Sequence, residues 1–127
     1  MSPVPPLPPF PASRPRRLRR DAAIRALVRE SSLAPSDLIY PVFVLDGKNQ
    51  AQDVASMPGV QRLSIDRLYA QAEACLALGV PVMALFPVID AGLKTPDGRE
   101  AENPDGLVPR AVRALKDRFP ELALLTD

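Results

Sequence analysis

Three short segments of the chain are apolar on both faces of an extended strand. They are LIYPVFVL (residues 38–45), VPVMALFPV (residues 80–88) and LALL (residues 122–125). Strands of this kind are typical of parallel sheets that other elements cover on both faces. We therefore expect three buried strands, which begin about 40 residues apart.

Two stretches between these strands have the helical spacing of apolar residues. Residues 64–79 start with Ser64 as an N-cap and stop at Gly79. Residues 106–119 end before Pro120, because proline cannot continue a helix. The positions predicted to face the core are Ile65, Leu68, Tyr69, Ala72 and Leu76 in the first helix, and Leu107, Val108, Ala111, Val112, Leu115 and Phe119 in the second.

The predicted order of strand, helix, strand, helix, strand is typical of a parallel sheet with right-handed crossovers. Both an open doubly wound sheet and a (β/α)8 TIM barrel have this order. The turns after the strands lack a glycine-rich phosphate fingerprint, which disfavours a dinucleotide-binding sheet. Long polar loops follow the first two strands instead, and in barrels such loops bear the functional residues. We predict an α/β fold that forms the N-terminal three β/α units of a TIM barrel.

The length of the chain matters for this prediction. A barrel needs eight strands and about 250 residues, whereas this chain has 127 residues. A free sheet of three parallel strands would leave both of its edges unpaired. The simplest interpretation is a fragment of a barrel, cut after its third strand.

The N-terminal part differs in composition from the rest. Residues 1–20 are rich in proline and arginine and are predicted to form an extended, flexible arm, with residues 21–127 as the partial barrel domain. Asp21 is expected to cap a short helix. Residues 1–30 contain seven arginines and two acids, whereas the remainder is net acidic. No aromatic platform accompanies the arginines, so we expect a solvated or subunit-contacting face and no nucleic acid partner.

Composition excludes several kinds of protein. Histidine is absent, which rules out a histidine-based triad or metal site within this chain. The single cysteine, Cys75, flanks the apolar stripe of the first helix and is interpreted as core. No apolar run approaches the roughly 20 residues of a membrane span. The proline-rich start disfavours both a secretory signal and an amphipathic transit peptide. We expect a cytoplasmic protein with no membrane partner.

The segments DLIYPVFVLDG, SMPGVQRLSID, LGVPVMALFPV and ENPDGLVPRAVRALKDRFPELALLTD follow one another along the chain. Together, over residues 14–127, they resemble the N-terminal part of the porphobilinogen synthase (δ-aminolevulinic acid dehydratase) family. The resemblance implies a TIM barrel whose N-terminal arm wraps a neighbouring subunit, and a homo-oligomer that is usually an octamer. It also implies the condensation of two 5-aminolevulinate molecules into porphobilinogen, with loss of two waters, in tetrapyrrole (heme) biosynthesis.

Two active-site lysines of that family form Schiff bases with the substrate ketones, and such lysines need a lowered pKa. The resemblance places them on later strands, beyond residue 127, together with the ligands of the family's zinc or magnesium ion. No residue here is therefore assigned to a metal. The lysines of this chain are predicted to lie in polar loops or on the solvent-exposed face of a helix, so none is expected to form a Schiff base. They are Lys48, Lys94 and Lys116. We expect the chain alone to be inactive.

One site residue of the family has a counterpart here. The family has an aspartate at the end of its third strand, which lines the substrate pocket and is placed to meet an amino group, and Asp127 matches it. An acid at the carboxyl end of a barrel strand is also typical of a functional residue. Asp46 and Asp90 end the first two strands and are interpreted as solvated turn formers.

Two other interpretations stay open. The chain could be a non-enzymatic interaction module that binds through its proline-rich basic arm. It could also belong to a different barrel enzyme, such as another Schiff-base aldolase.

Overall fold

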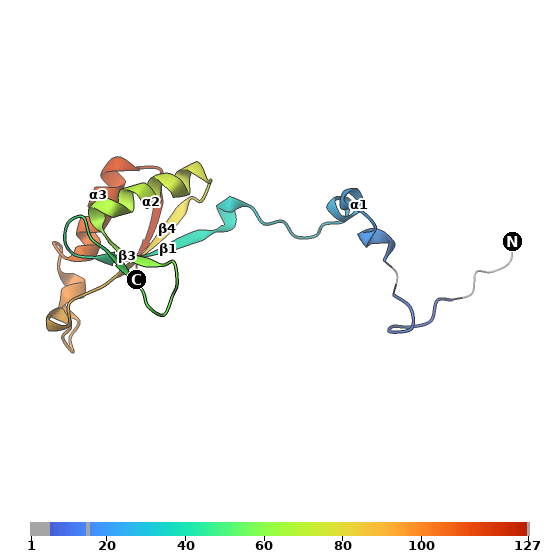
Figure 1. The fold of residues 1–127 in the computed structure, drawn as a ribbon, viewed down its shortest axis with the longest axis horizontal. Helices are drawn as coiled ribbons and strands as arrows, with labels where there is room; N and C mark the ends of the chain where they lie inside the picture. The colour runs from blue at the N-terminus through green and yellow to red at the C-terminus, as the bar shows by residue number, and fades with distance from the viewer. Residues whose placement is uncertain (1–5, 15, 127) are drawn as a thin grey trace. The chain divides into compact units, whose positions relative to one another are not determined.

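The computed structural model describes residues 6–14 and 16–126, and its contacts divide the chain into two units, Met1–Leu33 and Ala34–Asp127. In the first unit a 3-10 turn, η1 (Arg17–Arg19), precedes the short helix α1 (Ala22–Leu27) (Figure 1). The Asp21 carboxylate accepts a hydrogen bond from the Ile24 N–H at 2.9 Å, which confirms the predicted cap. Helix α1 groups with the arm by these contacts, whereas the sequence-based boundary after residue 20 assigns it to the barrel part.

The second unit is built on a five-stranded sheet with the strand order β2-β3-β1-β4-β5. Its strands are β1 (Ile39–Leu45), β2 (Ala51–Asp53), β3 (Gln61–Ser64), β4 (Val82–Pro87) and β5 (Ala123–Thr126). The three predicted strands are β1, β4 and β5, and they are parallel as expected.

Strands β2 and β3 were not predicted, and they extend the sheet beyond the three predicted strands. β3 pairs in parallel with β1, and β2 pairs antiparallel with β3. β2 is exposed along its whole length, and β3 buries only Leu63 and Ser64. Neither strand therefore has the apolar run by which the other three are recognised.

A tight turn reverses the chain between β2 and β3. The Val60 N–H donates to the Met57 carbonyl at 3.0 Å. Gly59 has φ of +83°, in the left-handed region that the third position of a type II turn requires. Residues 57–60 thus form a type II turn.

Helices α2 (Ile65–Ala77) and α3 (Leu107–Arg118) both cover the same face of the sheet (Figure 1). Their apolar stripes meet the sheet in one core, whose fully buried large side chains include Leu68, Met83, Leu115 and Leu122. Burying a leucine or methionine of this kind contributes about 1.5–3 kcal/mol. Cys75 is 5% exposed and belongs to this core, as interpreted from the sequence.

The opposite face of the sheet has no helix over it among the described residues of the second unit. Side chains alternate along a strand, so Pro41 and Phe43 point away from the buried Val42 and Val44. Phe43 lies beside Phe86 of β4, with ring centroids 6.1 Å apart. The strand pattern predicted that other elements cover both faces of the sheet. In the described part of the chain, helices cover only one face. In a TIM barrel this second face lines the packed interior.

Candidate functional site

The carboxyl ends of β1, β4 and β5 lie at one edge of the sheet. The register pairs Val44 with Pro87 and Leu85 with Thr126, so the three strands end at similar heights. In TIM barrels this edge bears the active site. We therefore treat the residues that follow these strands as the candidate functional site.

Asp46 directly follows β1 and is held by two sets of donors. Its Oδ2 accepts a hydrogen bond from Arg110 Nη2 at 2.7 Å, and its Oδ1 accepts from the Gly47 N–H at 2.8 Å. The bond from Arg110 and the bond from Gly47 hold the pKa of Asp46 below its ordinary value. Asp46 is thus a turn former, as interpreted, but it is also one half of an ion pair that the sequence did not reveal.

Asp90 follows β4 and acts within its own loop. Its carboxylate accepts from the Gly92 N–H at 2.8 Å and caps the 3-10 turn η3 (Ala91–Leu93). The interpretation of Asp90 as a turn former is confirmed.

The loop between β4 and α3 covers a cavity of about 500 Å³ at this edge. Lys94 and Thr95 of the loop line it, together with Thr126 of β5 and the first turn of α3. Glu100, on the 3-10 turn η4 (Arg99–Glu102), lines the same cavity and accepts hydrogen bonds from Asn103 Nδ2 at 3.1 and 3.3 Å. The cavity therefore combines a cationic and an anionic side chain near the ends of β4 and β5.

Close packing holds this loop against the start of α3. A Cβ atom on Gly106 would lie 2.9 Å from Glu100 Oε1 and 3.1 Å from the Asn103 carbonyl oxygen. Glycine fits well where η4 meets the helix, because a Cβ atom there would press on the Asn103 carbonyl, which is backbone and cannot rotate away. The loop therefore approaches the helix closely beside the cavity.

The lysines of the chain have no buried setting in the structure. Lys48 and Lys94 are exposed in their loops. Lys116 is exposed on α3, and its Nζ donates to the carbonyls of Pro120 at 2.6 Å and Leu122 at 3.0 Å. A Schiff-base lysine is usually desolvated or placed beside another cation, and none of these three is desolvated.

Asp127, the predicted substrate-pocket acid, lies outside the described residues. The residue before it, Thr126, ends β5 at the edge where the other strand ends meet. The assignment of Asp127 stays a prediction.

A metal ion does not fit the residues that the structure describes. Over residues 6–14 and 16–126, no group of three or more histidine, cysteine, aspartate or glutamate side chains could hold one. Cys75, the single thiol of the chain, is buried in the core, and burial raises its pKa. Family members use zinc or magnesium, and no ligand for either is assigned here.

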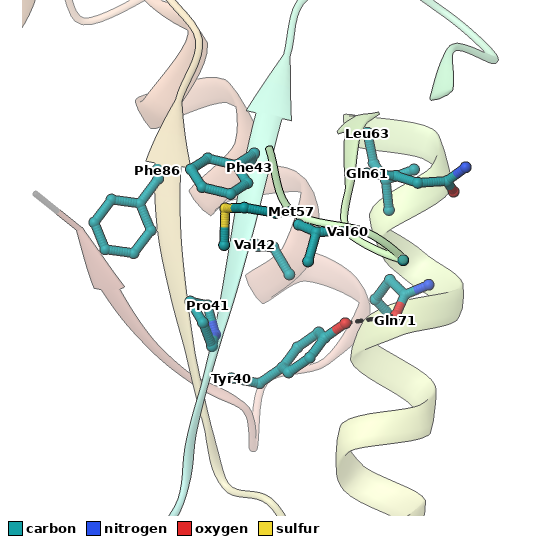
Figure 2. Close-up of a pocket in the computed structure, with 11 residues that line it drawn as sticks. Tyr40, Pro41, Val42, Phe43, Met57, Val60, Gln61, Leu63, Gln71 and Phe86 are labelled. Atoms are coloured by element: carbon teal, nitrogen blue, oxygen red, sulfur yellow. Dashed lines mark hydrogen bonds between the residues drawn. The ribbon is translucent and has the colours of Figure 1, made fainter. Parts of the chain in front are cut away.

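A second concavity lies away from this edge, along the amino half of β1 (Figure 2). Its volume is about 340 Å³, and its lining is mostly apolar. Tyr40 and Phe43 of β1, Met57 of the β2–β3 turn and Phe86 of β4 contribute to it. Phe86 is half-buried and lines this concavity.

Comparison with known proteins places these features in one family. The family model for delta-aminolevulinic acid dehydratase matches residues 12–127. The chain belongs to the delta-aminolevulinic acid dehydratase family. It is 48% identical over 116 residues to the enzyme of Bradyrhizobium diazoefficiens, and the match covers 91% of this chain and 33% of that protein. A chloroplastic member from Physcomitrium patens is 44% identical, with 91% of this chain and 27% of that protein covered.

The fold agrees with a solved member of the family. The crystal structure of delta-aminolevulinic acid dehydratase (porphobilinogen synthase) from Toxoplasma gondii ME49, in complex with the reaction product porphobilinogen, matches with a TM-score of 0.85 and 44% identity. The match covers 91% of this chain and 32% of that chain. The chain thus has the α/β fold of part of that TIM barrel, and it spans about a third of the length of the relatives it matches. Within residues 6–14 and 16–126, no helix is long and apolar enough to cross a membrane.

Proposed function

We propose that this chain supplies the first part of the barrel of a porphobilinogen synthase. The reaction would condense two molecules of 5-aminolevulinate into porphobilinogen, with loss of two waters. The observation that supports this most is the parallel arrangement of β1, β4 and β5, which matches a third of a barrel solved with porphobilinogen bound. Their aligned carboxyl ends would form one sector of the substrate pocket.

Asp127 is the residue of this chain that we assign to the pocket. It follows Thr126 at the carboxyl end of β5. A carboxylate at that position would accept hydrogen bonds from a substrate amino group and favour its charged form. The Schiff-base lysines and the zinc or magnesium ligands would come from strands other than those described here. The chain is therefore expected to bind no metal and to form no product without them.

The N-terminal arm would contact another subunit of a homo-oligomer, for which the family resemblance suggests an octamer. Large apolar side chains of the first unit are exposed, including Leu7, Phe10, Leu18 and Leu27. Such side chains beside an arginine cluster suit a partner surface that is partly apolar and net acidic. Residues 31–127 are net acidic, so a second copy would meet the charge requirement. We expect this assembly in the cytoplasm.

The test is reconstitution of a split barrel. The chain is co-expressed with the remaining two thirds of the Bradyrhizobium enzyme, and porphobilinogen formation from 5-aminolevulinate is measured. We expect product from the complex and none from the chain alone. Asp127→Asn in the complex should lower kcat/KM by about 10²-fold or more, as loss of a charged pocket contact does.

The Bradyrhizobium enzyme, split at the same place, is the control for reassembly. A complex that assembles but forms no product, while this control is active, would refute the proposed function. A monomeric chain that unfolds cooperatively and never joins the remainder would favour the interaction module.

A further inference from the structure

Aspartate is followed by glycine at three places in this chain, at residues 46–47, 97–98 and 105–106. Such a pair can rearrange to isoaspartate, because the glycine amide nitrogen can attack the side-chain carboxyl carbon of the aspartate. Glycine favours this reaction, since it has no side chain to hinder the approach and its backbone is unusually free. The three pairs differ in how the nitrogen and the carboxyl group are held, and this difference decides where the reaction can occur.

The backbone nitrogen of Gly47 is directed at the carboxylate of the residue before it. Its N–H donates to Asp46 Oδ1 at 2.8 Å, and no backbone carbonyl of the described residues accepts from it. The N–H groups of Gly98 and Gly106 instead donate to backbone carbonyls three residues earlier, each at 3.0 Å. Those two nitrogens are held in turns, so attack at either place first requires a turn to open.

The charge of the carboxyl group is the second requirement. A neutral carboxylic acid can lose water to the attacking nitrogen, whereas a carboxylate ion is a poor acceptor for a nucleophile. Arg110 donates to both oxygens of Asp46, at 2.7 and 3.3 Å, and such an ion pair favours the charged form. The bond from Arg110 is the main reason why the pKa of Asp46 lies below its ordinary value. Arg110 therefore opposes the reaction that the position of Gly47 favours.

We propose that Asp46 and Gly47 form a site of isoaspartate modification at the end of β1, and that Arg110 restrains it. The Gly47 nitrogen bonds to Cγ of Asp46, and the carboxyl hydroxyl leaves with the amide proton as water, which closes a five-membered succinimide. Water then opens the ring, and Asp46 is 66% exposed, so water reaches it. Cleavage between the nitrogen and the main-chain carbonyl carbon leaves the chain running through Cγ, with a free α-carboxylate. The water that was lost is regained, so the mass of the chain is unchanged.

The product alters the candidate functional site. Isoaspartate adds one carbon to the main chain directly after β1 and moves the free carboxylate to another atom, so the two bonds from Arg110 are lost. Arg110 Nε keeps its bond to the Asp105 carbonyl at 3.1 Å. This guanidinium then no longer joins the loop before α3 to the end of β1. The inference is independent of the proposed barrel function, because it concerns the residues of this chain alone.

Prolonged incubation of the full chain at neutral pH and physiological temperature tests this site. Isoaspartate at each of the three pairs is measured by mass spectrometry with electron-transfer fragmentation, which gives diagnostic ions for the isomer. We expect Arg110→Gln to raise isoaspartate formation at position 46 at least fivefold over the unchanged chain, and to change it less than twofold at positions 97 and 105. Asp46→Glu keeps the charge but cannot close a five-membered ring, so it should abolish the signal at position 46.

Arg99→Gln is the matched control. Arg99 Nη2 pairs with Asp97 Oδ2 at 2.9 Å, directly before Gly98, so this variant also removes an arginine from an aspartate that precedes glycine. Because the Gly98 N–H stays bonded within its turn, isoaspartate formation at position 97 should change less than twofold.

Three results would overturn the proposal. An unchanged rate at position 46 in Arg110→Gln would mean that the ion pair restrains nothing. An equal rise at all three pairs in that variant would indicate general loosening of the chain. A rise at position 97 in Arg99→Gln as large as that at position 46 in Arg110→Gln would mean that the direction of the Gly47 nitrogen has no effect.

Discussion

Arg110 of α3 donates to both carboxylate oxygens of Asp46, at 2.7 and 3.3 Å, although 64 residues separate the two. The pair joins the end of β1 to the first turns of α3. Arg110 Nε also donates to the Asp105 carbonyl at 3.1 Å, which ties the loop before the helix to the same group. One guanidinium thus connects two loops at the candidate site.

This ion pair should make stability depend on pH. The bond from Arg110 lowers the pKa of Asp46 in the folded chain. Its contribution is therefore present above the ordinary aspartate pKa of about 3.9 and is lost as the pH falls through the lower folded value. Asp46→Asn should cost roughly 0.2–1 kcal/mol at pH 7, because the pair is largely exposed. Urea unfolding at several pH values should find that this difference shrinks as the pH falls below the ordinary aspartate pKa. Asp117→Asn, an exposed acid of α3, is the control.

Ser64 should be important for stability despite its small size. It is fully buried, and its hydroxyl accepts from the Gln50 N–H at 2.9 Å and donates to Asp66 Oδ1 at 2.6 Å. Ser64→Ala leaves a backbone donor unpaired and should cost about 1–3 kcal/mol. The pKa of Asp66, which the serine lowers, should rise toward its ordinary value. NMR titration and urea unfolding measure both effects. Ser56 is exposed and serves as the control. If Ser64→Ala lowers the free energy of unfolding no more than Ser56→Ala does, this account is contradicted.

The core predicts a contrast between two leucines near α2. Leu68 is fully buried, whereas Leu78 is 70% exposed. Leu68→Ala should therefore destabilise the chain by about 2–5 kcal/mol, and Leu78→Ala by no more than about 0.5 kcal/mol. Denaturant unfolding followed by circular dichroism gives both values. Similar losses for the two variants would mean that α2 does not pack on the sheet through this stripe.

Lys116 should have a structural role at the start of β5. Its bonds to the carbonyls of Pro120 and Leu122 hold the turn between α3 and that strand. Lys116→Met should cost about 1 kcal/mol. The same substitution should speed amide hydrogen exchange at Ala123, whose N–H donates to the Pro81 carbonyl oxygen at 2.9 Å. Hydrogen exchange followed by NMR is the measurement. As a control, Lys94→Met, which replaces a lysine in a loop, should leave the amide exchange rate of Ala123 unchanged.

The pattern of apolar residues was sufficient for the part of the fold that is buried. Strands β1, β4 and β5, helices α2 and α3, and Cys75 in the core follow from local periodicity, because a buried face leaves a regular signature in the sequence. The order of four motifs was enough to indicate the family, which the family model over residues 12–127 shows. Asp90 as a turn former was also predictable, since its partner lies two residues away.

Tertiary structure alone decided the rest. Strands β2 and β3 are short and mostly exposed, so their pairing depends on a turn and on the edge of β1, and no apolar run marks them. The Asp46–Arg110 pair joins residues far apart in the chain. The apolar concavity lined by Tyr40 and Met57 does the same. Contacts of this kind depend on register and on which strand lies beside which. Those relationships are set when the whole sheet packs, and local residue patterns do not contain them.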